Sequence, residues 1–157
     1  MSVVVSDTSP LHYLILCGAE NILPRLFQQV VIPPAVFNEL QQANTPPLVR
    51  QWAATLPDWA AVQMPKSLNL KLNVDAGELE AICLAQEIHA AAILMDDRAG
   101  RTAAVHCGLA VVGTIGLLEQ AADSVVGIAG CEARASKGAE RFQTGYEALG
   151  RGSRPQR

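Results

Sequence analysis

The stretch VVVSDTSPL, which runs from Val3 to Leu11, is the segment that best indicates the fold. Its first four letters form a mostly β-branched run, as expected of a strand buried on both faces, and that run ends at Asp7. Ser9 has the character of a helix N-cap and Pro10 that of a first helical residue, so we expect a helix over residues 11–17. A buried strand followed at once by a helix predicts a parallel α/β sheet.

The alternation of strand and helix continues along the chain. Short apolar runs predict further strands at residues 29–32, 59–64, 91–95 and 109–112. Apolar residues at helical spacing predict helices at residues 21–28, 34–42, 48–56, 75–89, 98–107 and 114–122. Together with right-handed crossovers, this order predicts an α/β fold of three layers, α/β/α, around a central parallel sheet of four to five strands.

The chain has 157 residues and is 50% hydrophobic, which suits one domain with one core. We place that domain at residues 1–123. Residues 124–157 form an atypical tail, interrupted by glycines, for which we expect partly helical or disordered structure. A shifted or truncated reading frame would produce such a tail, and so would ordinary divergence.

Charge is divided unevenly between these parts. Residues 1–130 carry 12 acidic and 6 basic side chains, whereas residues 131–157 carry 3 acidic and 6 basic ones. An acidic body is not typical of nucleic-acid binding, because phosphate contacts usually require a basic surface. Carboxylates gathered around a metal ion would explain part of the negative charge, and the basic tail offers some counter-surface.

Several classes of protein are disfavoured. No apolar run approaches the roughly 20 residues needed to cross a membrane, and no signal peptide is recognisable, so we expect a cytoplasmic protein without a membrane partner. The four cysteines form no CxxC pair. The sequence lacks a P-loop, a glycine-rich dinucleotide turn and a Ser-His-Asp order, so the corresponding chemistries have no support.

Acidic residues fall where the strands of the predicted sheet end. Asp7 follows the first strand, and Asp96 and Asp97 follow the strand at 91–95. Glu39 lies one turn into the helix after the second strand, and Glu78 lies in the first turn of a later helix. In open parallel sheets, ligands bind beyond the carboxyl ends of the strands, so we expect these side chains to converge there.

Each of these acids also has a simpler explanation. Asp75-x-x-Glu78 is a capping box, which by itself accounts for both residues. We favour Asp75 as the cap and Glu78 as a ligand. Glu39 borders a buried helix stripe and could simply face solvent. Arg98 and Arg101 either pair with the neighbouring acids or contact phosphate, and the sequence leaves both alternatives open.

Converging carboxylates repel each other unless a cation lies between them. Oxygen ligands without paired cysteine or histidine favour Mg²⁺ or Mn²⁺ over zinc. Such a cation can activate a water molecule and stabilise charge on a phosphodiester, which is the chemistry of a metal nuclease.

Four motifs in this order resemble the PIN domains, and most of all the small prokaryotic PIN-like proteins related to VapC-type toxins. The resemblance covers about residues 1–122 and rests on the segments VVVSDTSPL (Val3–Leu11), PPAVFNEL (Pro33–Leu40), VDAGELEAICLA (Val74–Ala85) and ILMDDRAGR (Ile93–Arg101). It implies a Mg²⁺- or Mn²⁺-dependent endoribonuclease that hydrolyses RNA. It also implies the toxin of a toxin–antitoxin pair, a homodimer blocked by an antitoxin protein.

The resemblance also implies roles for individual residues. It assigns the catalytic acids to Asp7, Glu39, Glu78 and Asp96. It assigns metal binding to Asp7, Glu78, Asp96 and the adjacent Asp97. For contacts to the RNA we expect Ser9, which matches the Ser/Thr position of the family, together with Arg98 and Arg101.

Two alternatives belong to other classes. The first is a non-catalytic PIN-like module that binds RNA or a protein. The second is an aspartate-nucleophile phosphatase, which requires Asp-x-Asp after the first strand. Here Asp7 is followed by Thr8 and Ser9, which argues against it. The presence of every expected acid favours the nuclease.

Overall fold

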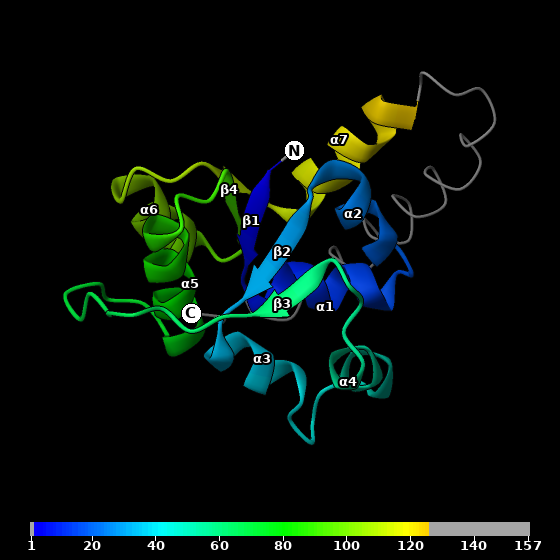
Figure 1. The fold of residues 1–157 in the computed structure, drawn as a ribbon, viewed down its shortest axis with the longest axis horizontal. Coiled ribbons are helices and arrows are strands. Elements are labelled where there is room, and N and C mark those ends of the chain that lie inside the picture. Colours follow the sequence, from blue (N-terminus) through cyan, green and yellow to red (C-terminus); the bar gives the residue numbers. More distant parts are fainter. Residues whose placement is uncertain (1, 126–157) are drawn as a thin grey trace, which may run out of the picture.

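The computed structural model describes residues 2–125. Its centre is a parallel sheet of five strands in the order β3-β2-β1-β4-β5 (Figure 1). The strands are β1 (Val3–Ser6), β2 (Gln29–Ile32), β3 (Ala60–Val62), β4 (Ala92–Leu94) and β5 (Val111–Val112). This confirms the predicted α/β fold with a parallel sheet, and the short strand at residues 60–62 lies at one edge.

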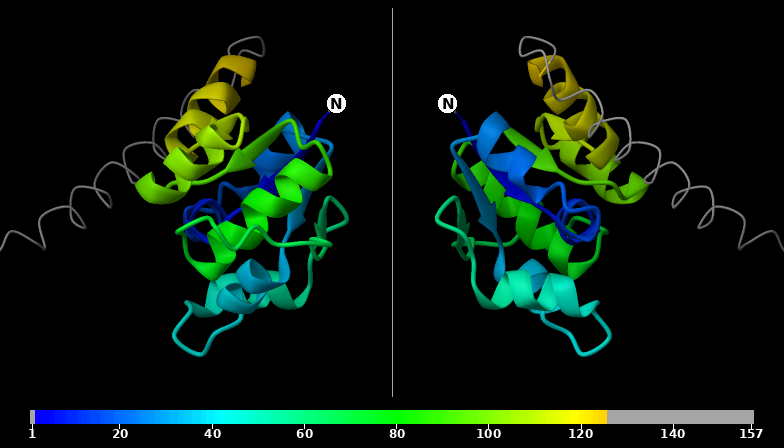
Figure 2. Two further views of the ribbon diagram at one scale, coloured as in Figure 1. Left: turned by 90° about the vertical axis from the view of Figure 1, so that its left-hand side faces the viewer. Right: turned by 90° about the vertical axis from the view of Figure 1, so that its right-hand side faces the viewer.

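Helices connect successive strands, and a last helix follows β5. They are α1 (Thr8–Leu16), a 3-10 turn η1 (Glu20–Ile22), α2 (Leu23–Leu26), α3 (Pro34–Leu40), α4 (Pro47–Ala54), α5 (Ala76–Glu87), α6 (Arg98–His106) and α7 (Thr114–Val125). Figure 2 shows α3 and α4 together at one end of the molecule and α7 toward the other. Among these helices, none in the described residues is both long and apolar enough to cross a membrane.

Two hydrophobic clusters show why the chain forms three layers. Alternate residues of β1 point to opposite faces, so Val4 belongs to one cluster and Val5 to the other, both fully buried. The Val4 cluster packs against α1, α2, α3, α4 and α7, and the Val5 cluster packs against α5 and α6. Because both faces are covered, the central strands consist almost entirely of apolar residues.

Two of the differences from the sequence-based expectations lie at the ends of helices. Helix α1 begins at Thr8 and has Asp7 at its N-cap position, so the prediction that Ser9 caps this helix and Pro10 opens it is wrong. Pro10 is the third helical residue, which costs nothing because the first helical N–H groups have no partner within the helix. Helix α7 continues to Val125, past its predicted end at residue 122. The tail predicted for residues 124–157 lies almost wholly outside the described residues.

Candidate functional site

The strand order changes direction between β1 and β4. Strands β2 and β3 extend the sheet on one side of β1, and β4 and β5 extend it on the other. Asp7 directly follows β1, and its backbone N–H continues the ladder by donating to the Leu94 carbonyl at 2.9 Å. Asp96 lies two residues after Leu94. Two acids therefore lie at the carboxyl ends of the two strands that flank the switch point, where open α/β sheets bind ligands.

Asp7 is held with little access to water. Its exposed fraction is 6%, and its side chain makes no capping hydrogen bond to α1. Burial raises its pKa from the ordinary value of 3.8 to about 7; the Thr8 amide opposes this rise, and the charges of Asp75, Glu39 and Asp96 add to it. A carboxyl in this setting retains a proton near neutral pH unless a positive charge approaches it.

Glu78 is the second buried acid, with an exposed fraction of 5%. It takes part in the capping box of α5: its N–H donates to Asp75 Oδ1 at 2.8 Å, and its Oε2 accepts from the Asp75 N–H at 3.2 Å. Burial raises its pKa from 4.5 to about 7, and the charges of Asp75, Asp97 and Asp7 contribute to the rise. The cap role of Asp75 is thus confirmed, while metal binding by Glu78 stays a prediction.

Glu39 reaches the same region from α3. The Thr8 hydroxyl donates a short hydrogen bond to Glu39 Oε2, which links α3 to the start of α1. Helix α3 is also fastened to α5, because the Ala35 N–H donates to Glu80 Oε2 at 2.7 Å. These two contacts place Glu39 beside Asp7, as predicted from the ends of the strands.

Asp96 is held by the first residue of α7. The Thr114 N–H donates to Asp96 Oδ1 at 2.8 Å, and the Thr114 hydroxyl donates to Asp96 Oδ2 at 2.6 Å. Strand pairing sets this contact, since Leu94 lies opposite Val112 and the Met95 N–H donates to the Val112 carbonyl at 3.0 Å. Residues 96 and 114 therefore follow their strands side by side.

The remaining predicted residues lie around these acids. Asp97 is exposed and caps α6, accepting from the Gly100 N–H at 3.0 Å. Arg98 is exposed, whereas Arg101 is half-buried and donates from Nη1 to the Met95 carbonyl at 3.1 Å. Ser9 is half-buried in the first turn of α1. Their roles in binding metal or RNA stay predictions.

Three glycines allow the acids to approach the backbone. A Cβ on Gly77 would lie 3.0 Å from Glu39 Oε1 and 3.5 Å from Asp7 Oδ1. A Cβ on Gly100 would lie 3.0 Å from Glu78 Cδ, and one on Gly113 would lie 3.1 Å from Asp96 Oδ1. Any larger residue at these positions would displace a predicted site carboxylate or its neighbours.

Comparison with known proteins shows the family of this chain. The model of a family described as a PIN domain matches residues 3–126. The chain belongs to the PIN-domain family. PIN domains are in general nucleases and generally use divalent metal ions. Among curated proteins, none matches the sequence.

Solved structures include at least one with a similar fold. It is a PilT N-terminus domain protein from the hyperthermophilic archaeon Sulfolobus solfataricus P2, with a TM-score of 0.55 and 16% sequence identity. The alignment covers 76% of this chain and 92% of that protein. At this identity the similarity supports the fold alone, and it agrees with the PIN-domain assignment.

The acids of this PIN domain suit a hard divalent cation in donor type and in charge. Within residues 2–125, no three acidic, histidine or cysteine side chains stand in an arrangement that could hold a metal ion. Their charges nevertheless act on one another, since Asp75, Glu39 and Asp96 all raise the pKa of Asp7. Oxygen donors whose negative charges are crowded in this way fit Mg²⁺ or Mn²⁺.

Several residues of the PIN domain that shape this site were not assigned to it from the sequence. Thr8 and Thr114 bind Glu39 and Asp96 across 31 and 18 residues of chain, respectively. The sequence signalled Thr114 only as the start of a helix. The glycines near the acids had no recognisable signal, because their role depends on what packs against them.

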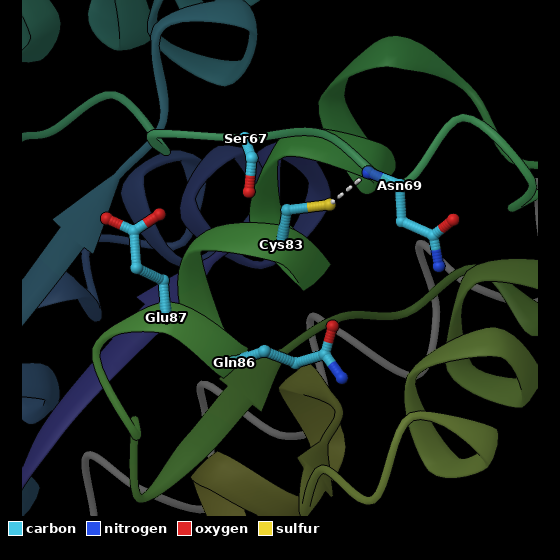
Figure 3. A pocket seen from close by; sticks show the side chains of 5 residues that line it. All are labelled: Ser67, Asn69, Cys83, Gln86 and Glu87. Atoms are coloured by element: carbon cyan, nitrogen blue, oxygen red, sulfur yellow. Dashed lines mark hydrogen bonds between the residues drawn. The ribbon is translucent and has the colours of Figure 1, made fainter.

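Two surface hollows lie elsewhere on the PIN domain. One, of about 390 Å³, is lined by Ser67, Asn69, Cys83, Gln86 and Glu87 (Figure 3). Its one hydrogen bond drawn in Figure 3 runs from the Asn69 N–H to Cys83 Sγ at 3.3 Å. None of the predicted site residues lines this hollow, so the acidic cluster remains the candidate site.

Proposed function

We propose that this PIN domain is a Mg²⁺- or Mn²⁺-dependent endoribonuclease that hydrolyses RNA phosphodiester bonds. The observation that carries the proposal is the placement of Asp7 and Asp96 at the switch point, with Glu39 and Glu78 brought beside them by α3 and α5. Membership of a family that is in general nucleolytic supports the same conclusion.

Asp7, Glu78, Asp96 and Asp97 would hold the cation once their side chains close around it, since within residues 2–125 no three of them are arranged to do so. When bound, such a cation activates a water molecule and stabilises negative charge on a phosphodiester. Asp7 and Glu78 have pKa values raised to about 7, so they must lose protons before they bind it. We therefore expect metal affinity to rise with pH through neutrality.

The other side chains orient the acids and the RNA. Thr8 fixes the Glu39 carboxylate by donating its hydroxyl, so this catalytic acid is held in one orientation. Arg98 is exposed at the start of α6, where its guanidinium is free to contact a phosphate that enters beside Asp97. Ser9 and Arg101 complete the proposed contacts to RNA.

The decisive test is RNA cleavage by the purified chain with Mg²⁺ or Mn²⁺. We expect cleavage to disappear with EDTA and in the Asp7→Asn variant. The matched control is Asp58→Asn, which removes an exposed acid just before β3 and should cleave like wild type. Full cleavage by Asp7→Asn would disprove the assignment. Failure of either cation to bind in calorimetry would favour a non-catalytic module that binds RNA or protein.

We also propose that the chain is the cytoplasmic toxin of a toxin–antitoxin pair and acts as a homodimer. The similarity of its four motifs to VapC-type toxins supports this proposal. Expression of the chain alone should then stop growth, and co-expression of the product of a small adjacent gene should restore it by forming a complex. Light scattering of the purified chain tests the dimer. Unimpaired growth under expression of an RNA-cleaving chain would contradict the toxin role.

A further inference from the structure

Thr114 contacts Asp96 with both its backbone and its side chain. Within the described residues, Thr114 is one of four buried polar or charged residues, and two of the others are Asp7 and Glu78. Its exposed fraction is 1%, and its hydroxyl donates to Asp96 Oδ2 while its N–H donates to Oδ1. The buried Thr114 hydroxyl is thus directed at a half-buried carboxylate that follows β4, next to the switch point.

Two hydrogen bonds to the two oxygens fix the plane of the carboxylate. A single bond would leave the Asp96 side chain free to turn about its last torsion, whereas bonds to both oxygens stop that rotation. Each carboxylate oxygen accepts from two directions, so each retains one direction for a further ligand. A carboxylate that is oriented beforehand binds a cation without the entropic cost of ordering it.

The core fixes Thr114 in turn. Leu117 on the same helix is fully buried, and its N–H donates to the Gly113 carbonyl at 3.0 Å. A Cβ on Gly113 would lie 2.5 Å from Arg101 Nη1 and 3.1 Å from Asp96 Oδ1. A small residue at 113 and an anchored helix α7 are therefore both needed to bring Thr114 onto the carboxylate.

We propose that Thr114 is a positioning residue, which orients the Asp96 carboxylate for a divalent cation. This inference rests on the proposed function, because it takes Asp96 as a metal ligand. The competing explanation is that the two hydrogen bonds only join the end of β4 to α7. In that case removal of the hydroxyl would lower stability and leave metal affinity unchanged.

The test compares Thr114→Val, which keeps the shape and removes the hydroxyl, with Thr114→Ser, which keeps the hydroxyl. Calorimetry with Mn²⁺ alone, without RNA, should show that the valine variant binds about 10–100-fold more weakly. The serine variant should stay within about twofold of wild type. Thr102→Val is the matched control, since its exposed hydroxyl bonds only the Arg98 carbonyl of its own helix, and it should bind like wild type.

Each outcome has a defined meaning. Wild-type Mn²⁺ affinity in Thr114→Val, with or without a lower Tm, overturns the positioning role. Added to Asp96→Asn, Thr114→Val should weaken Mn²⁺ binding no further, and a full additional loss would also overturn it. If the valine variant does not fold, Thr114→Ala replaces it with the same expectation. A wild-type chain that binds no Mn²⁺ and cleaves no RNA refutes the proposed function itself, which is a separate result.

Discussion

Asp7→Asn should make the metal-free protein more stable at pH 8 while abolishing its activity. The substitution keeps the size of the side chain and an oxygen that can accept from the Thr8 N–H, and it removes the charge. In the wild type that charge is buried, with 6% of the residue exposed, and it lies in the field of Asp75, Glu39 and Asp96. Ionisation of Asp7 therefore opposes folding, and the amide avoids this penalty.

The magnitude follows from the raised pKa. The folded protein holds the Asp7 proton up to about pH 7, whereas the ordinary pKa is 3.8. The stability that Asp7 contributes is fully present below pH 4 and is lost as pH rises through about 7. At about 1.4 kcal/mol per pH unit, the loss at pH 8 is roughly 4 kcal/mol. The charge of Asp7 also contributes to the raised pKa of Glu78. The cost of ionising Glu78 in the folded protein therefore also falls when asparagine replaces Asp7.

The assay is urea unfolding in EDTA at pH 5 and pH 8. Wild type should lose stability between these two values, and Asp7→Asn should lose less and should exceed wild type at pH 8. Asp58→Asn serves as the control and should follow wild type, since Asp58 is exposed. Saturation with Mn²⁺ at about 100 times its Kd should stabilise wild type by about 2.7 kcal/mol and Asp7→Asn hardly at all.

The reasoning would be refuted by an Asp7→Asn variant that is less stable than wild type in EDTA at pH 8. Such a result would mean that the Asp7 carboxylate is stabilised by hydrogen bonds in the folded state and is not penalised by burial. An equal loss of stability between pH 5 and pH 8 in wild type and in Asp7→Asn would also refute the reasoning, because groups other than Asp7 would then cause that loss.

Three further substitutions test neighbouring parts of the site and the core. Gly77→Ala adds a Cβ 3.0 Å from Glu39 Oε1 and 3.5 Å from Asp7 Oδ1, so RNA cleavage should fall about tenfold or more, while Tm should hold or rise because alanine favours helix. Thr8→Val removes the hydroxyl that holds Glu39 and should lower kcat about tenfold, with Thr8→Ser restoring it. Leu84→Ala in the core should cost about 2–5 kcal/mol in urea unfolding, and the folded fraction should keep its Mn²⁺ affinity.

The sequence predicted most of the fold because its local patterns agree with its tertiary structure. The two longest strands, β1 and β2, have the bounds that their β-branched runs predicted. The ends of helices were less predictable, as α1 shows. Ser9 and Pro10 resemble a cap and a first helical residue, yet the helix begins at Thr8 because Pro10 fits the third position equally well.

The positions of the candidate acids were predictable because strand ends are visible in a sequence. Asp7 and Asp96 follow buried strands, and parallel pairing brings the carboxyl ends of those strands to one edge. The residues that hold the acids were not predictable in this way. Thr8 binds Glu39 and Thr114 binds Asp96 only after α3 and α7 have packed, so no local pattern signals either contact.

The role of Glu78, as helix cap or as metal ligand, was ambiguous for the same reason, because local sequence does not show how a residue is packed. A capping box and a metal ligand require the same residue at the same position, and the structure contains the capping box. A helix cap alone does not require burial, since helix ends usually face water. Glu78 has only 5% of its surface exposed, with its carboxyl carbon 3.0 Å from where a Cβ on Gly100 would lie, and its pKa is raised to about 7. Folding therefore places this acid where its charge is unfavourable, and a bound cation would reverse that penalty.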